Sequence, residues 1–241
     1  MKILSFDSTA KIATVAVTED SDLLALYSIN NGLTQSELLL PMAENILSSL
    51  QLTISDIDLF ATSVGPGSFT GVRIGTALVK GLAFGRSIPC VGVSALEELA
   101  ENLSGLDGII APCMDARRSQ VYNALFRCKD GCIERLTDDR AISLKELGEE
   151  LRAYEGERIY LCGDGYAGAE RAIRESGVKT KKTPPLLIPE NAYSVARVAY
   201  RMYLKGEYTD DVGLQPTYLR MPQAERERLE RLKESEGKQN G

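Results

Sequence analysis

Apolar and polar positions alternate from the start of the chain. In KILSFDSTAKIATVAVTEDSDLLALYSIN one apolar run ends at Asp7, a polar turn covers residues 8–11, and two further alternating runs pass through Val17 and Leu26. A period of two is typical of β-strands that bury one face. The pattern therefore predicts a three-stranded meander.

The same pattern returns further along the chain. An apolar run at 109–114 ends before Asp115, which opens a polar turn, and a strand at 121–126, a KDG turn and a third strand follow. Superposing Asp7 on Asp115 indicates an internal duplication with a spacing of about a hundred residues. After each meander the sequence predicts a helix, a short strand and a second helix. These elements lie at 34–50, 57–65 and 71–85 in the first copy, and at 144–154, 158–165 and 168–176 in the second.

The predicted fold class is α/β, with two duplicated meander-plus-helix domains. Halves of this kind resemble the actin-like ATPase (ASKHA) fold of actin, the Hsp70 nucleotide domain and sugar kinases, in which the two turns after the first strands grip phosphates. We expect the first domain at 1–104 and the second at 105–190, with a C-terminal helix at about 191–222 packing back on the first. The segment 223–241 is charged and poor in apolar residues, which predicts a disordered tail.

Composition narrows the class of protein. The chain has 241 residues, of which 44% are hydrophobic and 26% charged, as in ordinary globular proteins. No apolar run is long enough for a membrane span and no signal peptide is recognisable, so we expect a cytoplasmic protein without membrane contact. The five cysteines form no C-x-x-C pair, and we expect no metal site. The net charge of −6 disfavours a broad nucleic-acid surface.

The chain contains no histidine. Catalytic triads with histidine, histidine-ligated metals and imidazole acid-base chemistry are therefore excluded within this chain. Any catalysis would have to use carboxylates, lysine, tyrosine or a cofactor.

The stretch SVGPGSFTGVRIG at 63–75 allows three interpretations. It lacks the Lys-Ser/Thr of a phosphate-binding P-loop, and it does not match G-x-G-x-x-G. It also fails the G-x-S-x-G pattern of a nucleophile elbow. The remaining interpretation is a strand-turn-helix junction in which Ser68 or Thr70 caps the following helix.

The two helices of the first domain have unusual faces. In the second helix, four glycines and three apolar residues share an arc of about 120°, and each interior glycine costs about 1 kcal/mol relative to alanine. Either another helix or backbone approaches closely there, or the face packs on its own sheet. The first helix begins with a capping box at Thr34 to Glu37. Its apolar residues spread over about 200° of the helix circumference. Together the helices predict a partner-binding face at Leu38, Leu39, Met42, Ile46, Gly71, Gly75, Leu78 and Leu82.

Five motifs together resemble one bacterial protein family. LSFDSTA, TQSELLLPM, SVGPGSFTGVRIGTALVKGLA, PCMDARRSQVY and QPTYLR are similar to the TsaB (YeaZ) family of tRNA threonylcarbamoyladenosine biosynthesis proteins, over nearly the whole chain to Arg220. The resemblance implies an actin-like two-domain fold and a role in modifying the adenosine beside the tRNA anticodon. It implies a non-catalytic subunit that pairs through its first two helices with the paralogue TsaD, which binds a metal through histidines and carries the chemistry. The absence of histidine here agrees with that division of labour.

The resemblance also bears on ligands and partners. Asp7, Ser8 and Thr9 stand where actin-like ATPases grip phosphate, but Ser8 replaces a glycine and crowds the backbone. Arg117 and Arg118 make the second turn bulky. We therefore expect no intrinsic cofactor, and weak or partner-dependent ATP or ADP binding. Further expectations are a TsaE ATPase in the larger complex, a homodimer when the chain is alone, and tRNA contact only through the complex.

Three other functions remain open from the residues alone. Asp7 and Asp115 could serve a stand-alone small-molecule kinase on the actin-like fold. A peptidase would have to use Ser-Lys chemistry, because no histidine is present. A direct tRNA-binding protein is the third alternative, which the acidic balance disfavours.

Overall fold

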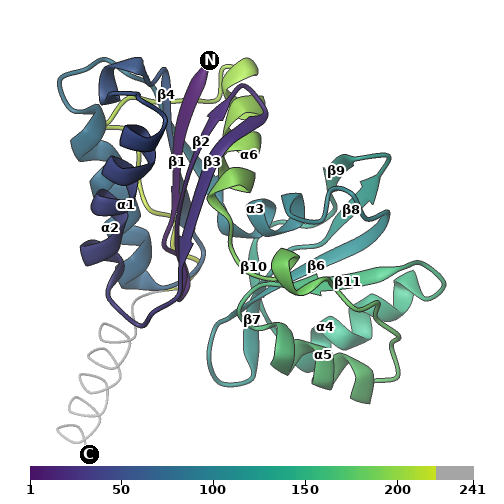
Figure 1. The fold of residues 1–241 in the computed structure, drawn as a ribbon. Helices are drawn as coiled ribbons and strands as arrows, with labels where there is room; N and C mark the ends of the chain where they lie inside the picture. The colour runs from purple at the N-terminus through teal and green to yellow at the C-terminus, as the bar shows by residue number, and fades with distance from the viewer. Residues whose placement is uncertain (221–241) are drawn as a thin grey trace, which may run out of the picture.

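The computed structural model describes residues 1–220, which form two α/β halves (Figure 1). The sheet of the first half has the order β3-β2-β1-β4-β5, in which β1 to β3 are the antiparallel meander and β4 and β5 run parallel to β1. The strands are β1 Lys2–Asp7, β2 Ala13–Glu19, β3 Asp22–Ile29, β4 Leu59–Gly65 and β5 Cys90–Ser94. The predicted N-terminal meander is confirmed.

Helices cover both faces of this sheet. On one face lie α1 Gln35–Ser49 and α2 Phe69–Ala83, and on the other lies α6 Ala192–Leu204, far away in sequence (Figure 1). One apolar core fills the space under α1 and α2, and a second joins Ile3, Leu59 and Val91 of the sheet to α6. A 3₁₀ turn, η1 Ile54–Asp56, precedes β4.

The second half repeats the meander around a central strand. Its strands are β6 Gly108–Asp115, β7 Gln120–Asn123, β8 Phe126–Lys129, β9 Cys132–Arg135, β10 Arg140–Ser143 and β11 Ile159–Cys162. Along one edge β6 pairs antiparallel with both β7 and β8, and along its other edge it pairs parallel with β11. The remaining elements are α4 Leu144–Leu151, η2 Arg152–Tyr154, α5 Tyr166–Glu175 and η3 Pro185–Leu187. The duplicated α/β fold class is confirmed.

The single strand predicted at 121–126 is divided into β7 and β8. Pro112 of β6 lies opposite the break and has no backbone N–H to continue the ladder. Its carbonyl instead accepts a 2.8 Å hydrogen bond from the Asn123 side chain, and the Leu125 N–H donates to the Thr137 hydroxyl at 2.8 Å. The proline therefore interrupts the pairing, although both pieces keep one register.

The chain crosses between the halves twice. It leaves the first half through α3 Ala95–Glu101, which leads from β5 to β6, and returns through residues 188–191, which lead into α6. The two crossings are tied together because the buried carboxylate of Glu101 in α3 pairs with Arg197 and Arg201 of α6, at 2.9 and 2.6 Å.

The C-terminal helix is shorter than predicted. We expected a helix over about 191–222, but α6 ends at Leu204, where Gly206 adopts a φ of +80° that stops the helix. Thr209 then pairs with Cys90 at the edge of the first sheet. The predicted disordered tail at 223–241 lies outside the described residues. Within residues 1–220, no helix has the length and apolarity to cross a membrane.

Candidate functional site

The glycine-rich stretch joins β4 to α2 beside the β1–β2 turn. Ser68 is the N-cap residue of α2, and its hydroxyl accepts a 3.2 Å hydrogen bond from the Gly71 N–H. The Ser68 N–H itself donates to the Thr9 carbonyl at 2.7 Å. The predicted strand-turn-helix junction and the Ser68 cap are therefore confirmed, and the junction is fixed to the first turn of the chain.

Two of the helix glycines allow α2 to press against this turn. A Cβ atom at Gly71 would lie 1.9 Å from the Ser8 carbonyl oxygen, and one at Gly75 would lie 2.7 Å from the Ser8 hydroxyl. Because real Cβ contacts are essentially never this short and the Ser8 carbonyl is backbone, only glycine fits at position 71, whereas a side chain at position 75 would displace the Ser8 hydroxyl. The close approach that Gly71 permits is thus to backbone within the same half of the chain.

The three residues predicted to touch nucleotide lie in the interior. Asp7, Ser8 and Thr9 are each at most 1% exposed. The Asp7 carboxylate accepts hydrogen bonds from the Thr9 N–H at 3.0 Å and the Thr9 hydroxyl at 2.9 Å, and the Ser8 hydroxyl donates to Gly71. Burial raises the pKa of Asp7, opposed by its hydrogen bonds. Internal partners occupy the polar atoms of Asp7 and Ser8, and of the three only Thr9 borders open space, so the weak or partner-dependent nucleotide contact at this turn stays a prediction.

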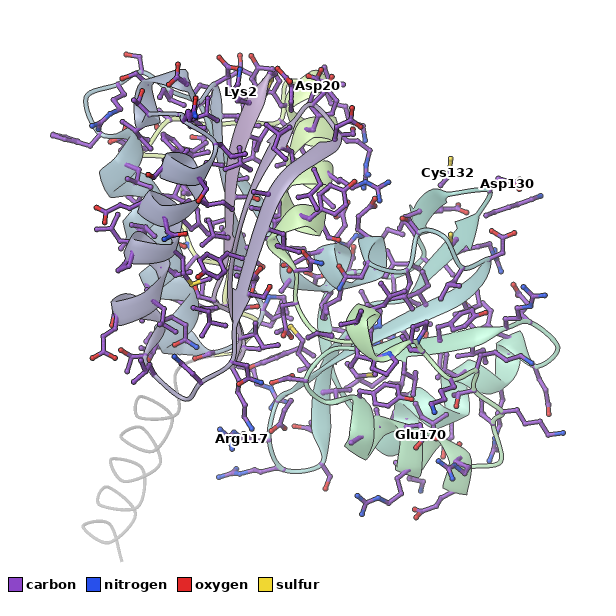
Figure 2. All side chains as sticks on the ribbon, in the orientation of Figure 1. Lys2, Asp20, Arg117, Asp130, Cys132 and Glu170 are labelled. Atoms are coloured by element: carbon purple, nitrogen blue, oxygen red, sulfur yellow. The ribbon has the colours of Figure 1, made fainter. Side chains whose placement is uncertain are left out.

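That open space is a cleft of about 650 Å³ between the halves. The first half contributes Thr9, Lys11 and the loop 66–70, and the second contributes the β6–β7 turn, including Arg117. Figure 2 shows Arg117 at this turn, on the side that faces the first half. The cleft occupies the place where the two copies of the meander turn meet, as the duplication predicts.

Charges of both signs line the cleft. Asp164 accepts a 2.9 Å hydrogen bond from the Asp115 N–H, and Asp115 accepts one from the Arg117 N–H at 2.8 Å. Burial raises the pKa of Asp164. Arg117, Arg118 and the next residue all have φ near +60°, a strained conformation for residues other than glycine. The second turn therefore carries exposed arginines, and the carboxylates of Asp115 and Asp164 accept hydrogen bonds from its backbone.

The C-terminal segment closes one side of the cleft, which the sequence reasoning missed. The Thr217 N–H donates to the Val64 carbonyl at 2.8 Å. Tyr218 stacks on Phe69 with ring centroids 4.8 Å apart, and its hydroxyl accepts a 2.9 Å hydrogen bond from Arg73. Arg220 reaches the second half, donating to the Ala116 carbonyl at 3.2 Å. The signal in the sequence was the aromatic and basic QPTYLR motif, which was used only for the family resemblance.

The predicted partner-binding face is largely interior. Leu39, Met42 and Ile46 of α1 are at most 4% exposed because they pack on the first sheet, and Gly71 and Gly75 of α2 are buried against the β1–β2 turn. These five residues cannot contact a partner while the fold is intact, so their assignment to an interface is wrong.

Other residues of the two helices reach the surface. Leu38 of α1 and Leu78 and Leu82 of α2 are half-buried at the helix flanks, and their predicted role stays a prediction. Leu40, which the prediction omitted, is 42% exposed. The omission arose because the apolar arc of α1 divides into a buried stripe and an exposed flank, and periodicity alone does not show where the division falls.

In the part of the chain that the structure describes, no group of three or more cysteine, aspartate and glutamate side chains has the arrangement of a metal site.

Comparisons with known proteins agree with the resemblance in the motifs. The family model for TsaD, tRNA N6-adenosine threonylcarbamoyltransferase, matches residues 34–225. The Bacillus subtilis tRNA threonylcarbamoyladenosine biosynthesis protein TsaB is 32% identical over 97% of this chain and 100% of its own length. The Escherichia coli TsaB is 29% identical over 91% of this chain and 95% of its own.

A solved structure supports the fold. YeaZ from Pseudomonas aeruginosa superposes with a TM-score of 0.75 at 24% identity, covering 90% of this chain and 99% of that one. The chain therefore belongs to the family of the TsaD model and, within it, to the TsaB proteins of tRNA threonylcarbamoyladenosine biosynthesis.

Proposed function

We propose that this chain is a non-catalytic subunit in the formation of N6-threonylcarbamoyladenosine in tRNA, and that it acts by pairing with and activating a TsaD paralogue. Its TsaB relatives carry the name of that pathway. The observation that carries the proposal is the filled phosphate turn, in which the polar groups of Asp7 and Ser8 are bound to Thr9 and Gly71. Because these internal bonds leave few free donors for phosphate at the first turn, the arrangement supports a subunit that relies on a partner for chemistry.

The residue inventory supports the same division of labour. The chain has no histidine, so it supplies neither imidazole ligands nor an imidazole base. The carboxyl groups nearest to the cleft, Asp115 and Asp164, are engaged with backbone N–H groups. Both carboxyl groups therefore have structural roles in the turns of the second half.

The outer surface of α1 and α2 supports pairing with a partner of the same fold. The half-buried flank of α2 carries Ile74, Leu78 and Leu82 at intervals of four residues, which places them in one row along the helix. Leu38 and Leu40 are at the surface of α1, which packs beside α2 (Figure 1). An apolar surface of this kind marks an association site on a protein. We assign it to TsaD, and to a second copy of the chain when TsaD is absent.

The resemblance to the TsaB family supplies the remaining partners of the proposal. A TsaE ATPase joins the larger complex, and tRNA is contacted through the complex. ATP or ADP binds this chain weakly, or only with the partner present, because the polar side chains of Asp7 and Ser8 are bound to Thr9 and Gly71. The cytoplasm is the compartment of such a complex.

A reconstituted modification assay tests the proposal. Threonylcarbamoylation of tRNA by the cognate TsaD is measured with and without this chain, together with co-purification of the two proteins. We expect no transfer by this chain alone and strong stimulation on adding it to TsaD. Modification by TsaD that is unchanged by this chain, or transfer by this chain alone, would refute the proposal.

Substitutions at the helix surface test the docking site. Leu40→Glu and Leu82→Glu place a charge in the proposed interface, and because an unpaired buried charge costs several kcal/mol, binding should weaken by at least a hundredfold. Leu186→Glu is the matched control, since Leu186 is 87% exposed in η3, in the second half. Unchanged TsaD affinity in folded Leu40→Glu and Leu82→Glu proteins would place the interface elsewhere.

A further inference from the structure

Three buried carboxyl groups meet where the chain crosses between its halves. Asp7 ends β1 of the first half, Glu98 lies in α3 on the outward crossing, and Glu190 lies on the return crossing just before α6. Asp7 and Glu98 are 0% exposed and Glu190 is 3% exposed. We call these three residues the crossover carboxyls.

The crossover carboxyls lie near one another and next to both crossings. The side chains of Asp7 and Glu98 are within hydrogen-bond reach of each other. Glu98 accepts a 2.8 Å hydrogen bond from the Asn191 N–H, so the outward crossing is bonded to the return crossing. The Asp164 N–H, in the turn after β11 of the second half, lies close to the Glu190 carboxyl group. The three groups therefore link four segments from the two halves.

Among the ion pairs of residues 1–220, no lysine or arginine neutralises the crossover carboxyls. None of these pairs includes Asp7, Glu98 or Glu190. The α6 arginines are bound to Glu101, one turn further along α3. The carboxylate of Asp164 disfavours negative charge on Glu190, and the neighbouring thiol of Cys162 is buried and uncharged. Lys11 acts on Asp164 from the cleft side.

Two carboxylates cannot face each other in the interior without a proton between them. A bare pair of like charges in a low-dielectric site is strongly repulsive, whereas a protonated carboxyl donates a hydrogen bond to its neighbour. One oxygen of Glu98 and one of Glu190 have no hydrogen-bond partner, so each has a free position for a proton. Burial and the neighbouring carboxylates raise the pKa of Glu98 well above its usual value, and raise that of Glu190 to about 8.

We propose that Asp7, Glu98 and Glu190 form a proton-dependent latch between the two halves, which holds them together while the cluster keeps its protons and releases them when it loses them. Each half has an apolar core of its own, so loosening the crossings does not unfold either. The Asp164 turn and the β1–β2 turn both border the cleft. Release of the latch therefore widens the cleft.

The direction of the pH effect follows from proton linkage. The folded chain retains protons that the same glutamates release in the unfolded chain near pH 4.5. Raising the pH therefore favours the unfolded state, and for one retained proton the folded-to-unfolded ratio falls about tenfold per pH unit up to the folded pKa. The raised pKa of Glu190 contributes to the free energy of unfolding. This contribution is fully present below pH 4.5 and is lost as the pH rises through about 8.

Two measurements on the full chain test the latch. Urea unfolding at pH 6, 7 and 8.5 compares the natural protein with Glu98→Gln, Glu190→Gln and the double variant. The distance between the halves is measured by pulsed electron resonance between spin labels at Glu44→Cys in α1 and Arg171→Cys in α5, with exposed Cys132 changed to serine. The other four cysteines are buried and stay unlabelled.

As the pH rises, we expect the free energy of unfolding of the natural protein to fall and its spin-label distance distribution to become longer and broader. In the double variant, neither quantity should change with pH. Glu190→Gln alone should remove about half of the slope, and it keeps the test available where the double variant does not fold. Glu157→Gln, which removes an exposed partner of Arg127, should leave the slope unchanged. A distance independent of pH in the natural protein, or an equal slope in Glu190→Gln, would overturn the latch.

Discussion

The hydroxyl of Ser8 donates a 2.9 Å hydrogen bond to the carbonyl of Gly71, which joins the first turn of the chain to the first turn of α2. This bond exists because Gly71 has no side chain, and a Cβ atom there would overlap the Ser8 carbonyl. The contact therefore joins the glycine-rich motif, through Gly71, to Ser8, the residue that departs from a phosphate-binding turn. The serine that replaces a glycine of the phosphate-binding turn also holds the helix.

Substitution of the packed glycine tests this contact. Gly71→Ala should lower the free energy of unfolding by about 1 to 3 kcal/mol, because the added methyl group forces the helix away from the turn. Gly81→Ala is the matched control in the same helix, where a Cβ atom meets nothing within 4 Å. It should raise stability by about 0.5 to 1 kcal/mol through helix propensity alone. Urea unfolding measures both, and equal effects would contradict the account.

Glu101 provides a second stability prediction. Its carboxylate is 1% exposed and pairs with two arginines of α6, so removing it leaves their charges without a partner. Glu101→Ala should lower the free energy of unfolding by about 2 to 4 kcal/mol, somewhat less than for a fully buried pair because the arginines are partly exposed. Glu157→Ala, at an exposed pair, should change it by at most about 1 kcal/mol. Thermal and urea unfolding of the two variants distinguish these results.

The cysteines should differ sharply in reactivity. Burial raises the pKa of Cys90 to about 11 and that of Cys113 to about 12, so their thiolate forms are rare at neutral pH, whereas Cys132 is exposed. Ellman's reagent at pH 8 should therefore modify one thiol quickly in the native protein and all five after unfolding. Cys132→Ser should remove the fast phase. A fast phase that survives this change would show that a second thiol is accessible.

The C-terminal segment should depend on Tyr218 for its position. Tyr218→Ala removes both the stacking on Phe69 and the hydrogen bond from Arg73. We expect amide exchange to rise by at least tenfold over residues 214–220 while the β1 to β3 meander stays protected. Tyr208→Ala is the control, because Tyr208 is exposed and stacks on Tyr203 of α6 instead. Equal exchange in the natural protein and Tyr218→Ala would contradict the assigned role.

Local signals in the sequence predicted the elements well. The Thr34 N–H donates to the Glu37 carboxylate in the predicted capping box, and Ser68 caps α2 as expected. These features depend on residues a few positions apart, which the sequence displays directly. The duplicated meander was found for the same reason, since alternation is a local property.

The sequence was least informative about contacts between distant segments. Gly71 and Gly75 were visible as unusual residues, but their neighbour Ser8 comes from another element. Leu39 and Met42 are apolar whether they face the sheet or a partner, so composition could not separate the two. Glu98 and Glu190 gave no signal at all, because their relation exists only once both crossings are placed.

The return of α6 to the first sheet has a consequence for synthesis of the chain. The first half consists of two separate stretches of sequence, and the second half lies wholly between them. When residue 190 has left the ribosome, the second half has all its strands and helices, while the face of the first sheet around Ile3, Leu59 and Val91 still lacks Val195 and Ala199. The half that begins the chain is therefore the last to be completed, and a nascent chain exposes that apolar face until its C-terminal helix emerges.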